Sequence, residues 1–87
     1  MTKLEEKLIG LGYIHRYNPH HQLTEFFKNI RFSEYCLRIT HKLDLDIIIE
    51  SEVSTMYAIQ TQQDIDNLQQ AYNILQSDLE VLKEYES

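Results

Sequence analysis

Two hydrophobic periodicities divide the chain. In the C-terminal third, apolar residues recur at intervals of three and four, as they do on one face of an α-helix: Ile65, Leu68, Tyr72, Leu75, Leu79 and Leu82. Upstream, apolar and polar residues alternate over residues 35–40 and again over 43–53, which is typical of half-buried strands. The sequence therefore predicts a set of strands followed by one long helix.

Both expected helices begin with capping signals. The long helix is expected over residues 61–85, where Thr61 and Asp64 have the spacing of a capping box. A short N-terminal helix follows from Thr2 and Glu5, with leucines spaced behind them, and it ends at Gly10 or Gly12. A second apolar stripe widens the face of the long helix to about 160°, and its members are Ala71, Ile74, Val81 and Tyr85.

The strands are expected to form a small sheet. Residues 13–17 are β-prone and precede an Asn18-Pro19 turn signal, whereas residues 23–32 fit either a helix or a strand. A strand is favoured for 23–32, because it completes an antiparallel sheet of workable size. A tight connection is expected at His41-Lys42, between the strands at 35–40 and 43–53.

The expected fold is α+β, as a single domain over residues 1–87. It consists of a short N-terminal helix, an antiparallel sheet of three to four strands, and a long C-terminal helix packed on one sheet face. The other sheet face is then free to be polar.

Charge adds a candidate surface to this picture. The net charge is −6, and ten of the fourteen acids follow Leu43 with one base among them, a balance of −9. In the expected 43–53 strand, four acids alternate onto the uncovered face around one isoleucine: Asp44, Asp46, Glu50, Glu52 and Ile48. Such a face would attract a protein with a basic surface, with the isoleucine as an apolar centre. The alternative is a solvated face that keeps the sheet soluble, partly neutralised by Arg38 and Arg16.

Other chemistries find little support in the sequence. No metal is expected from His15, His20, His21, His41 and Cys36, whose spacing matches no chelating motif and which are expected mostly in turns and at the surface. No cofactor or catalytic motif is recognised, so an enzyme is not expected. The longest apolar run, residues 47–49, is too short to span a membrane, and the single cysteine fits a cytoplasmic protein.

The negative net charge argues against direct nucleic-acid binding by the chain as a whole. Residues in the first half of the chain could still form a local basic and aromatic patch. They are Arg16, Lys28, Arg31, Arg38 and Lys42, with Tyr13, Tyr17, Phe26 and Phe27.

Residues 61–82, Thr-Gln-Gln-Asp-Ile-Asp-Asn-Leu-Gln-Gln-Ala-Tyr-Asn-Ile-Leu-Gln-Ser-Asp-Leu-Glu-Val-Leu, resemble the last helix of small phage and prophage accessory proteins of Gram-positive bacteria. The upstream layout, with Leu11-Gly12-Tyr13 and then strands ending at Val53, is similar to theirs. Such proteins include acidic inhibitors of host defence nucleases, among them anti-CRISPR proteins, some of which cover a basic DNA-reading surface. The resemblance implies that the contact would be carried by Asp44, Asp46, Glu50 and Glu52.

Two functions are therefore expected as alternatives. The first is a non-enzymatic acidic module that binds a basic protein surface in the host cytoplasm and so acts as an inhibitor. The second is a structural or regulatory homo-oligomer, such as a homodimer, that assembles through the C-terminal helix at Ile74, Val81 and Tyr85.

Overall fold

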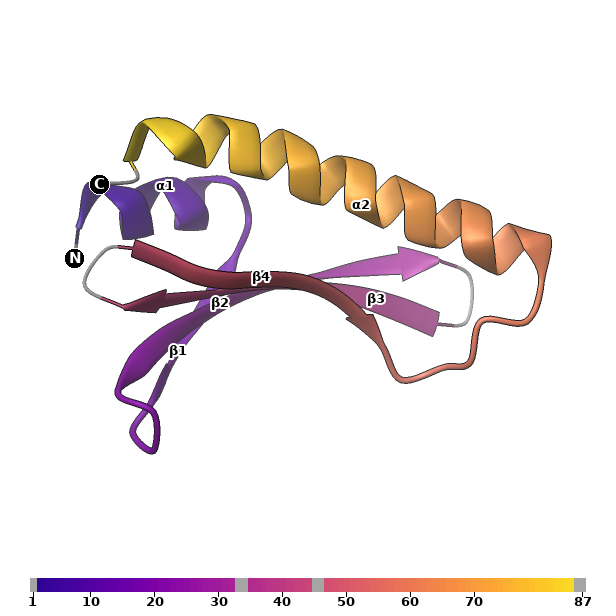
Figure 1. Cartoon of the computed structure of the whole chain (residues 1–87), viewed down its shortest axis with the longest axis horizontal. Helices are drawn as coiled ribbons and strands as arrows, with labels where there is room; N and C mark the ends of the chain where they lie inside the picture. Colours follow the sequence, from indigo (N-terminus) through magenta and orange to yellow (C-terminus); the bar gives the residue numbers. More distant parts are fainter. Residues whose placement is uncertain (1, 33–34, 45–46, 86–87) are drawn as a thin grey trace.

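Two helices lie on one face of a four-stranded antiparallel sheet (Figure 1). The computed structural model describes residues 2–32, 35–44 and 47–85. In chain order the elements are α1 (Lys3–Gly10), β1 (Ile14–Asn18), β2 (Leu23–Phe32), β3 (Tyr35–Asp44), β4 (Ile47–Thr55), α2 (Gln62–Leu82) and a 3₁₀ turn, η1 (Lys83–Tyr85). The strand order is β1-β2-β3-β4, so β1 and β4 form the two edges. This arrangement confirms the α+β prediction.

The helix starts confirm the predicted caps. Thr61 accepts a hydrogen bond from the backbone of Asp64, whose side chain accepts one from the backbone of Thr61 in return. At α1, Thr2 accepts a hydrogen bond from the backbone of Glu5 at 3.2 Å. After α1 the chain turns at Gly12, whose φ of +98° is unfavourable for other residues. None of the helices in the described ranges is both long and apolar enough to cross a membrane.

The segment at 23–32 is a strand, as favoured from the sequence. It pairs with β1 on one side and with β3 on the other. The turn between β1 and β2 is closed by Asn18, whose side-chain oxygen accepts hydrogen bonds from the backbone N–H groups of His20 and His21.

The predicted connection at His41-Lys42 is wrong, because both residues lie inside β3. That strand runs on to Asp44, and β4 begins at Ile47. The alternating pattern at 43–53 therefore spans two strands and the connection between them. Asp44 lies on a different strand from Glu50 and Glu52, and the predicted position of Asp46 lies outside the described residues.

At the start of β4, an irregularity in strand pairing places residues on the opposite sheet face from the one that the sequence predicts. Lys42 pairs with Glu50, but the next residue, Leu43, pairs with Ile48, because the register shifts between Lys42 and Leu43. Ile48 consequently packs against the core on the inner face, which is the face covered by the helices. Ile49 is 53% exposed on the opposite, outer face. The prediction that Ile48 stands among the acids is wrong, and Ile49 takes that place.

The buried side of α2 differs from the predicted stripe. Its buried residues are Asn67, Ala71, Leu75, Asp78 and Leu82. Ile65 and Tyr72, both assigned to the stripe from the sequence, are instead 50% and 42% exposed. The helix is rotated about its axis relative to the predicted orientation. Two of its polar residues face inward, because Asn67 hydrogen-bonds to Tyr35 and Asp78 to Tyr13.

The residues predicted for self-association are largely used within the chain. Ile74 and Tyr85 pack against the hydrophobic core, and Val81 is half-buried. The core joins both helices to the sheet through Leu4, Leu8, Tyr13, Phe26, Ile39, Leu43, Leu75 and Leu82.

The exchange of faces at Ile48 and Ile49 predicts opposite costs for two neighbouring substitutions. Ile48→Ala should lower the free energy of unfolding by about 2 kcal/mol, because it empties part of the core. Ile49→Ala should change it by less than about 0.5 kcal/mol, because that side chain is exposed. Urea denaturation of the two variants gives the comparison. Equal costs, or a larger cost at Ile49, would show that the alternation of β4 is not shifted.

Candidate functional site

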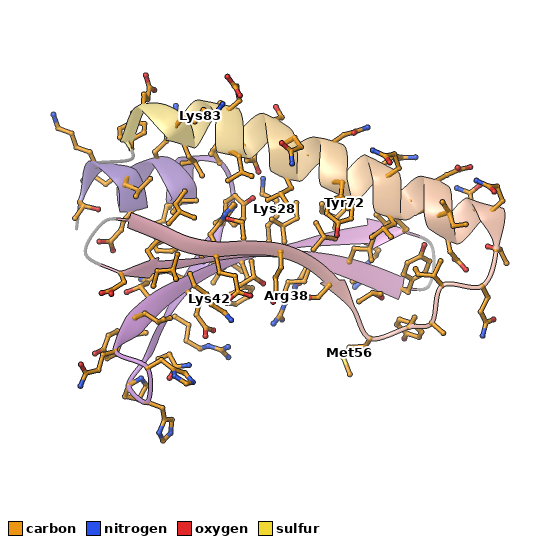
Figure 2. All side chains as sticks on the ribbon, in the orientation of Figure 1. Lys28, Arg38, Lys42, Met56, Tyr72 and Lys83 are labelled. Carbon is orange, nitrogen blue, oxygen red and sulfur yellow. The ribbon has the colours of Figure 1, made fainter. Side chains whose placement is uncertain are left out.

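The outer face carries a row of alternating charges across all four strands. Arg16, Glu25, Lys42 and Glu50 are consecutive partners in the strand register. Arg16 contacts Glu25 at 3.0 Å, and Lys42 contacts Glu50 at 3.3 Å. Figure 2 shows Lys42 and Arg38 on this face and Lys28 on the opposite side of the sheet, beneath α2. Lys42, rather than Arg38, is therefore the cation that partly neutralises the predicted acidic residues.

Charge on the outer face changes sign along the strands. Among the described residues, one end, called the acidic end, holds four carboxylates and two cations, a formal charge of −2: Glu25, Asp44, Glu50, Glu52, Arg16 and Lys42. Of the residues that the structure describes, the other end, called the basic end, holds the charged residues Arg31 and Arg38, a charge of +2. The acids are thus confined to part of the outer face, whereas the sequence predicted an acidic face.

A shallow hollow of about 400 Å³ lies within the acidic end. Leu23 and Ile49 supply its apolar lining, and Glu25, Lys42 and Glu50 supply much of its charged lining. Of the predicted binding residues, Asp44, Glu50 and Glu52 are exposed on this face, and Ile48 is not on it. The hollow therefore combines two apolar side chains with charged ones.

The carboxylates act on the groups around them. The hydrogen bond to Glu50 raises the pKa of Lys42, and the charges of Glu50, Glu52 and Glu25 add to this effect. Hydrogen bonds from Arg16 and Asn18 lower the pKa of Glu25. A cation at this end of the face is therefore held in its charged form by several carboxylates at once.

The predicted basic and aromatic patch is divided by the sheet. Phe26 and Lys28 belong to the inner face, where Lys28 is paired with Asp78. Phe27 belongs to the outer face, and the guanidinium carbons of Arg38 and Arg16 lie 4.6 and 5.8 Å from its ring centre. On the outer face the patch retains Phe27 with two arginines beside its ring, whereas Arg31 and Lys42 lie farther along the strands.

A chain of buried polar groups connects the sheet to α2. Tyr13 donates a hydrogen bond to Asp78 at 2.7 Å, and the Lys28 ammonium contacts the same carboxylate oxygen at 3.0 Å. His41 is fully buried, with Nε2 lying 3.0 Å from the Tyr13 oxygen and Nδ1 lying 2.7 Å from Ser51 Oγ. The prediction of surface histidines fails for His41, although His15, His20 and His21 are exposed.

The protons of this chain can be assigned from its geometry. Burial and the neighbouring Asp78 raise the pKa of Tyr13 well above its usual range, so Tyr13 keeps its proton and donates a hydrogen bond to Asp78. Its oxygen then accepts from His41 Nε2–H, and Ser51 donates to Nδ1. Burial lowers the pKa of His41 to about 4, which keeps the ring neutral.

The serine, histidine and carboxylate in this chain do not form an accessible nucleophilic site. His41 has no exposed surface, and Tyr13 stands between it and Asp78. In a Ser-His-Asp triad the carboxylate bonds directly to the histidine. Through Asp78 the network joins α2 to Tyr13 and to Lys28 of β2, and the described residues contain no cluster of potential metal ligands.

Sequence reasoning missed Leu23, Glu25 and Ile49 as members of the hollow. Leu23 and Glu25 come from β2, and their position beside β4 depends on the pairing of β2 with β3 and of β3 with β4. The one available signal is the parity of Leu23, Glu25 and Phe27, which places them on one face of a strand. No local signal marks Ile49, because the register shift that exposes it arises from strand pairing.

The burial of neutral His41 predicts that the fold is less stable in mild acid. Below the unfolded pKa of 6.5 the unfolded chain binds a proton that the folded chain excludes until about pH 4, so stability is lost as the pH falls. The free energy of unfolding should drop by about 2 kcal/mol between pH 7 and pH 5. Urea denaturation of the wild type at these two pH values measures it.

Two variants assign that loss to His41. His41→Gln should show a much smaller change between pH 7 and pH 5, whatever its stability at pH 7. His20→Gln, which replaces an exposed turn histidine, should keep the dependence of the wild type. An unchanged pH dependence in His41→Gln would contradict the assignment.

Comparison of the chain with family models, with curated proteins and with solved structures finds no match.

Proposed function

We propose that the chain is a non-enzymatic protein-binding module that uses the acidic end of its sheet to bind a basic surface on another protein. The observation that carries this proposal is the exposed Ile49 in a hollow bordered by Glu25 and Glu50. An apolar centre with a charged rim is the usual composition of a transient protein interface.

Electrostatics support a basic partner over a neutral or acidic one. Around the hollow, carboxylates outnumber cations, and Glu52 makes no ion pair among the described residues. Glu50 is already in contact with Lys42, but its side chain is 51% exposed, so a second cation can reach it. Charges of this kind raise the rate of association and select the sign of the partner.

The edge position of β4 supports the same choice. An edge strand presents unpaired backbone groups to any extended segment that approaches. Self-pairing of β4 over its full length, antiparallel, would be centred on Ser51 and would place Glu50 of each copy opposite Glu52 of the other. Like charges directly opposite destabilise a strand pair. The edge therefore disfavours its own copy and accepts a strand that carries lysine or arginine.

The proposed partner class is a nucleic-acid-binding protein, such as a host defence nuclease, whose basic surface the module would cover. This part of the proposal comes from the resemblance of residues 61–82 to phage accessory proteins of the anti-CRISPR type. Proteins that neutralise phosphates with lysine and arginine present the surface that the acidic end would attract.

Charge reversal at the acidic end should abolish partner binding. Glu50→Lys/Glu52→Lys and, separately, Ile49→Asp should each fail to retain the basic proteins of a host lysate that the wild type captures at low salt. The matched control is Glu80→Lys/Glu84→Lys, which makes the same charge change on the exposed side of α2 and η1. Wild-type capture should weaken as salt rises. Equal capture by the control and the Glu50/Glu52 variant would refute the proposal.

Self-association through α2 is a second candidate function, favoured by the exposure of Ile65 and Tyr72. These residues are seven positions apart and share one flank of the helix. Sedimentation at micromolar concentration should then show a dimer that Tyr72→Glu converts to a monomer. Val81→Glu tests the flank predicted from the sequence. A wild type that is strictly monomeric would remove this candidate.

A further inference from the structure

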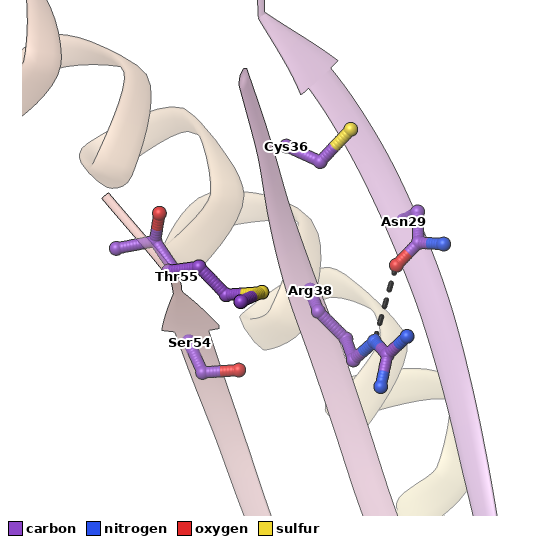
Figure 3. Close-up of a pocket in the computed structure, with 6 residues that line it drawn as sticks. Asn29, Cys36, Arg38, Ser54 and Thr55 are labelled. Carbon is purple, nitrogen blue, oxygen red and sulfur yellow. Dashed lines mark hydrogen bonds between the residues drawn. The ribbon is translucent and has the colours of Figure 1, made fainter.

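A second hollow, of about 470 Å³, lies at the basic end of the outer face (Figure 3). Its lining comes from three adjacent strands and the residue after β4: Asn29, Cys36, Arg38, Ser54, Thr55 and Met56. Asn29, Arg38 and Ser54 are consecutive partners across β2, β3 and β4. Arg38 therefore lies in the middle of the row, with a polar side chain on each side.

The guanidinium of Arg38 is held in one orientation. Its Nε donates a hydrogen bond to the side-chain oxygen of Asn29 at 3.2 Å, and its carbon lies 4.6 Å from the centre of the Phe27 ring. These two contacts occupy one edge and one face of the group. The terminal amino groups are left as donors, in the fork arrangement that matches an oxyanion.

No acid in the described part of the chain forms an ion pair with Arg38. Arg16 provides the contrast, because it lies over the same ring and contacts Glu25 at 3.0 Å. The nearest acid along β4 is Glu52, two residues before Ser54 and on the same face. Among the described residues, Arg38 is thus a cation that two contacts hold at the hollow, without a carboxylate partner.

The rest of the hollow restricts what the anion can be. Met56 is fully exposed beside Arg38, and more apolar than polar surface lines the space. One arginine matches a single negative charge, whereas a doubly charged phosphate would meet Glu52 nearby and the chain's net charge of −6. At about 30 Å³ for each water-sized group, the hollow has room for a ligand of amino-acid size.

We infer that the Arg38 hollow is a binding site for a carboxylate attached to a small apolar group. The carboxylate accepts hydrogen bonds from the terminal amino groups of Arg38, and the apolar group lies against Met56 and Cys36. Ser54 is placed to donate a further hydrogen bond. The site lies at the opposite end of the outer face from the acidic hollow, so this inference does not rest on the proposed function.

The single cysteine of the chain provides a direct readout, because Cys36 lines the hollow. The rate at which iodoacetamide alkylates Cys36 is measured with increasing N-acetyl-leucine, a carboxylate on an apolar side chain. The acid should slow alkylation in a saturable way. N-acetyl-leucinamide, which lacks the charge, should bind more weakly by a factor of about ten or more. Equal protection by the acid and the amide would overturn the inference.

Four variants locate the effect. Arg38→Gln should weaken the protection by N-acetyl-leucine about tenfold or more, whereas Arg16→Gln, the other arginine on Phe27, should leave it unchanged. Ser54→Asp keeps the arginine but supplies it with a carboxylate, and it should also abolish protection. Glu52→Gln removes a nearby negative charge and should strengthen protection. Protection that Arg38→Gln and Arg16→Gln reduce equally would overturn the inference.

A peptide that ends in leucine with a free carboxylate distinguishes the source of the ligand. Tighter binding than N-acetyl-leucine identifies the site with the end of a partner chain, and equal binding identifies it with a free acid. Both outcomes support a site that binds a carboxylate. If neither ligand protects Cys36, the inference is contradicted.

Discussion

Asp78 is a buried carboxylate on the inward side of α2, and its need for partners fixes how the helix lies on the sheet. A buried charge is costly unless it is paired and hydrogen-bonded. Lys28 and Tyr13 supply both contacts, from β2 and from the residue before β1. If α2 were rotated to bury Tyr72, Asp78 would move away from both partners. The exposure of Tyr72 and the burial of His41 behind Tyr13 follow from this one arrangement.

The same arrangement determines which cations the outer face retains. Lys28 is used on the inner face, where it neutralises Asp78 and lies 4.4 Å from the centre of the Tyr13 ring. With both helices on that face, the opposite face of the sheet has no covering element in the described residues. Its charges are therefore arranged by strand register alone. Register brings Lys42 to Glu50 and leaves Arg38 beside the neutral residues Asn29 and Ser54.

The sequence could predict features that depend on residues close together in the chain, but not those that depend on residues far apart. Capping at Thr61 and the three-four spacing of α2 depend on residues within one or two helical turns, so helix starts and element types were predictable. The β3–β4 connection was misplaced because alternation continues from Leu43 into β4, so that pattern alone gives no break. The shift that exposes Ile49 depends on pairing between strands, and no local pattern records it. No local pattern marks Asp78 for burial, because its partners lie 50 and 65 residues away in the chain.

Separation along the strands allows one sheet face to offer two opposite charges. Asp44 and Arg38 are six residues apart on β3, which corresponds to roughly 20 Å along a strand. The screening length at physiological ionic strength is about 8 Å, so Asp44 and Arg38 act on an approaching ligand almost independently. The row next to Arg38 contains the uncharged Phe27 and Thr40 but also Glu52, whose charge lies between those of Asp44 and Arg38. The acidic end can therefore attract a basic partner over several ångströms of solvent. Arg38, held against Phe27 and Asn29, acts instead by contact, through donors that are already oriented.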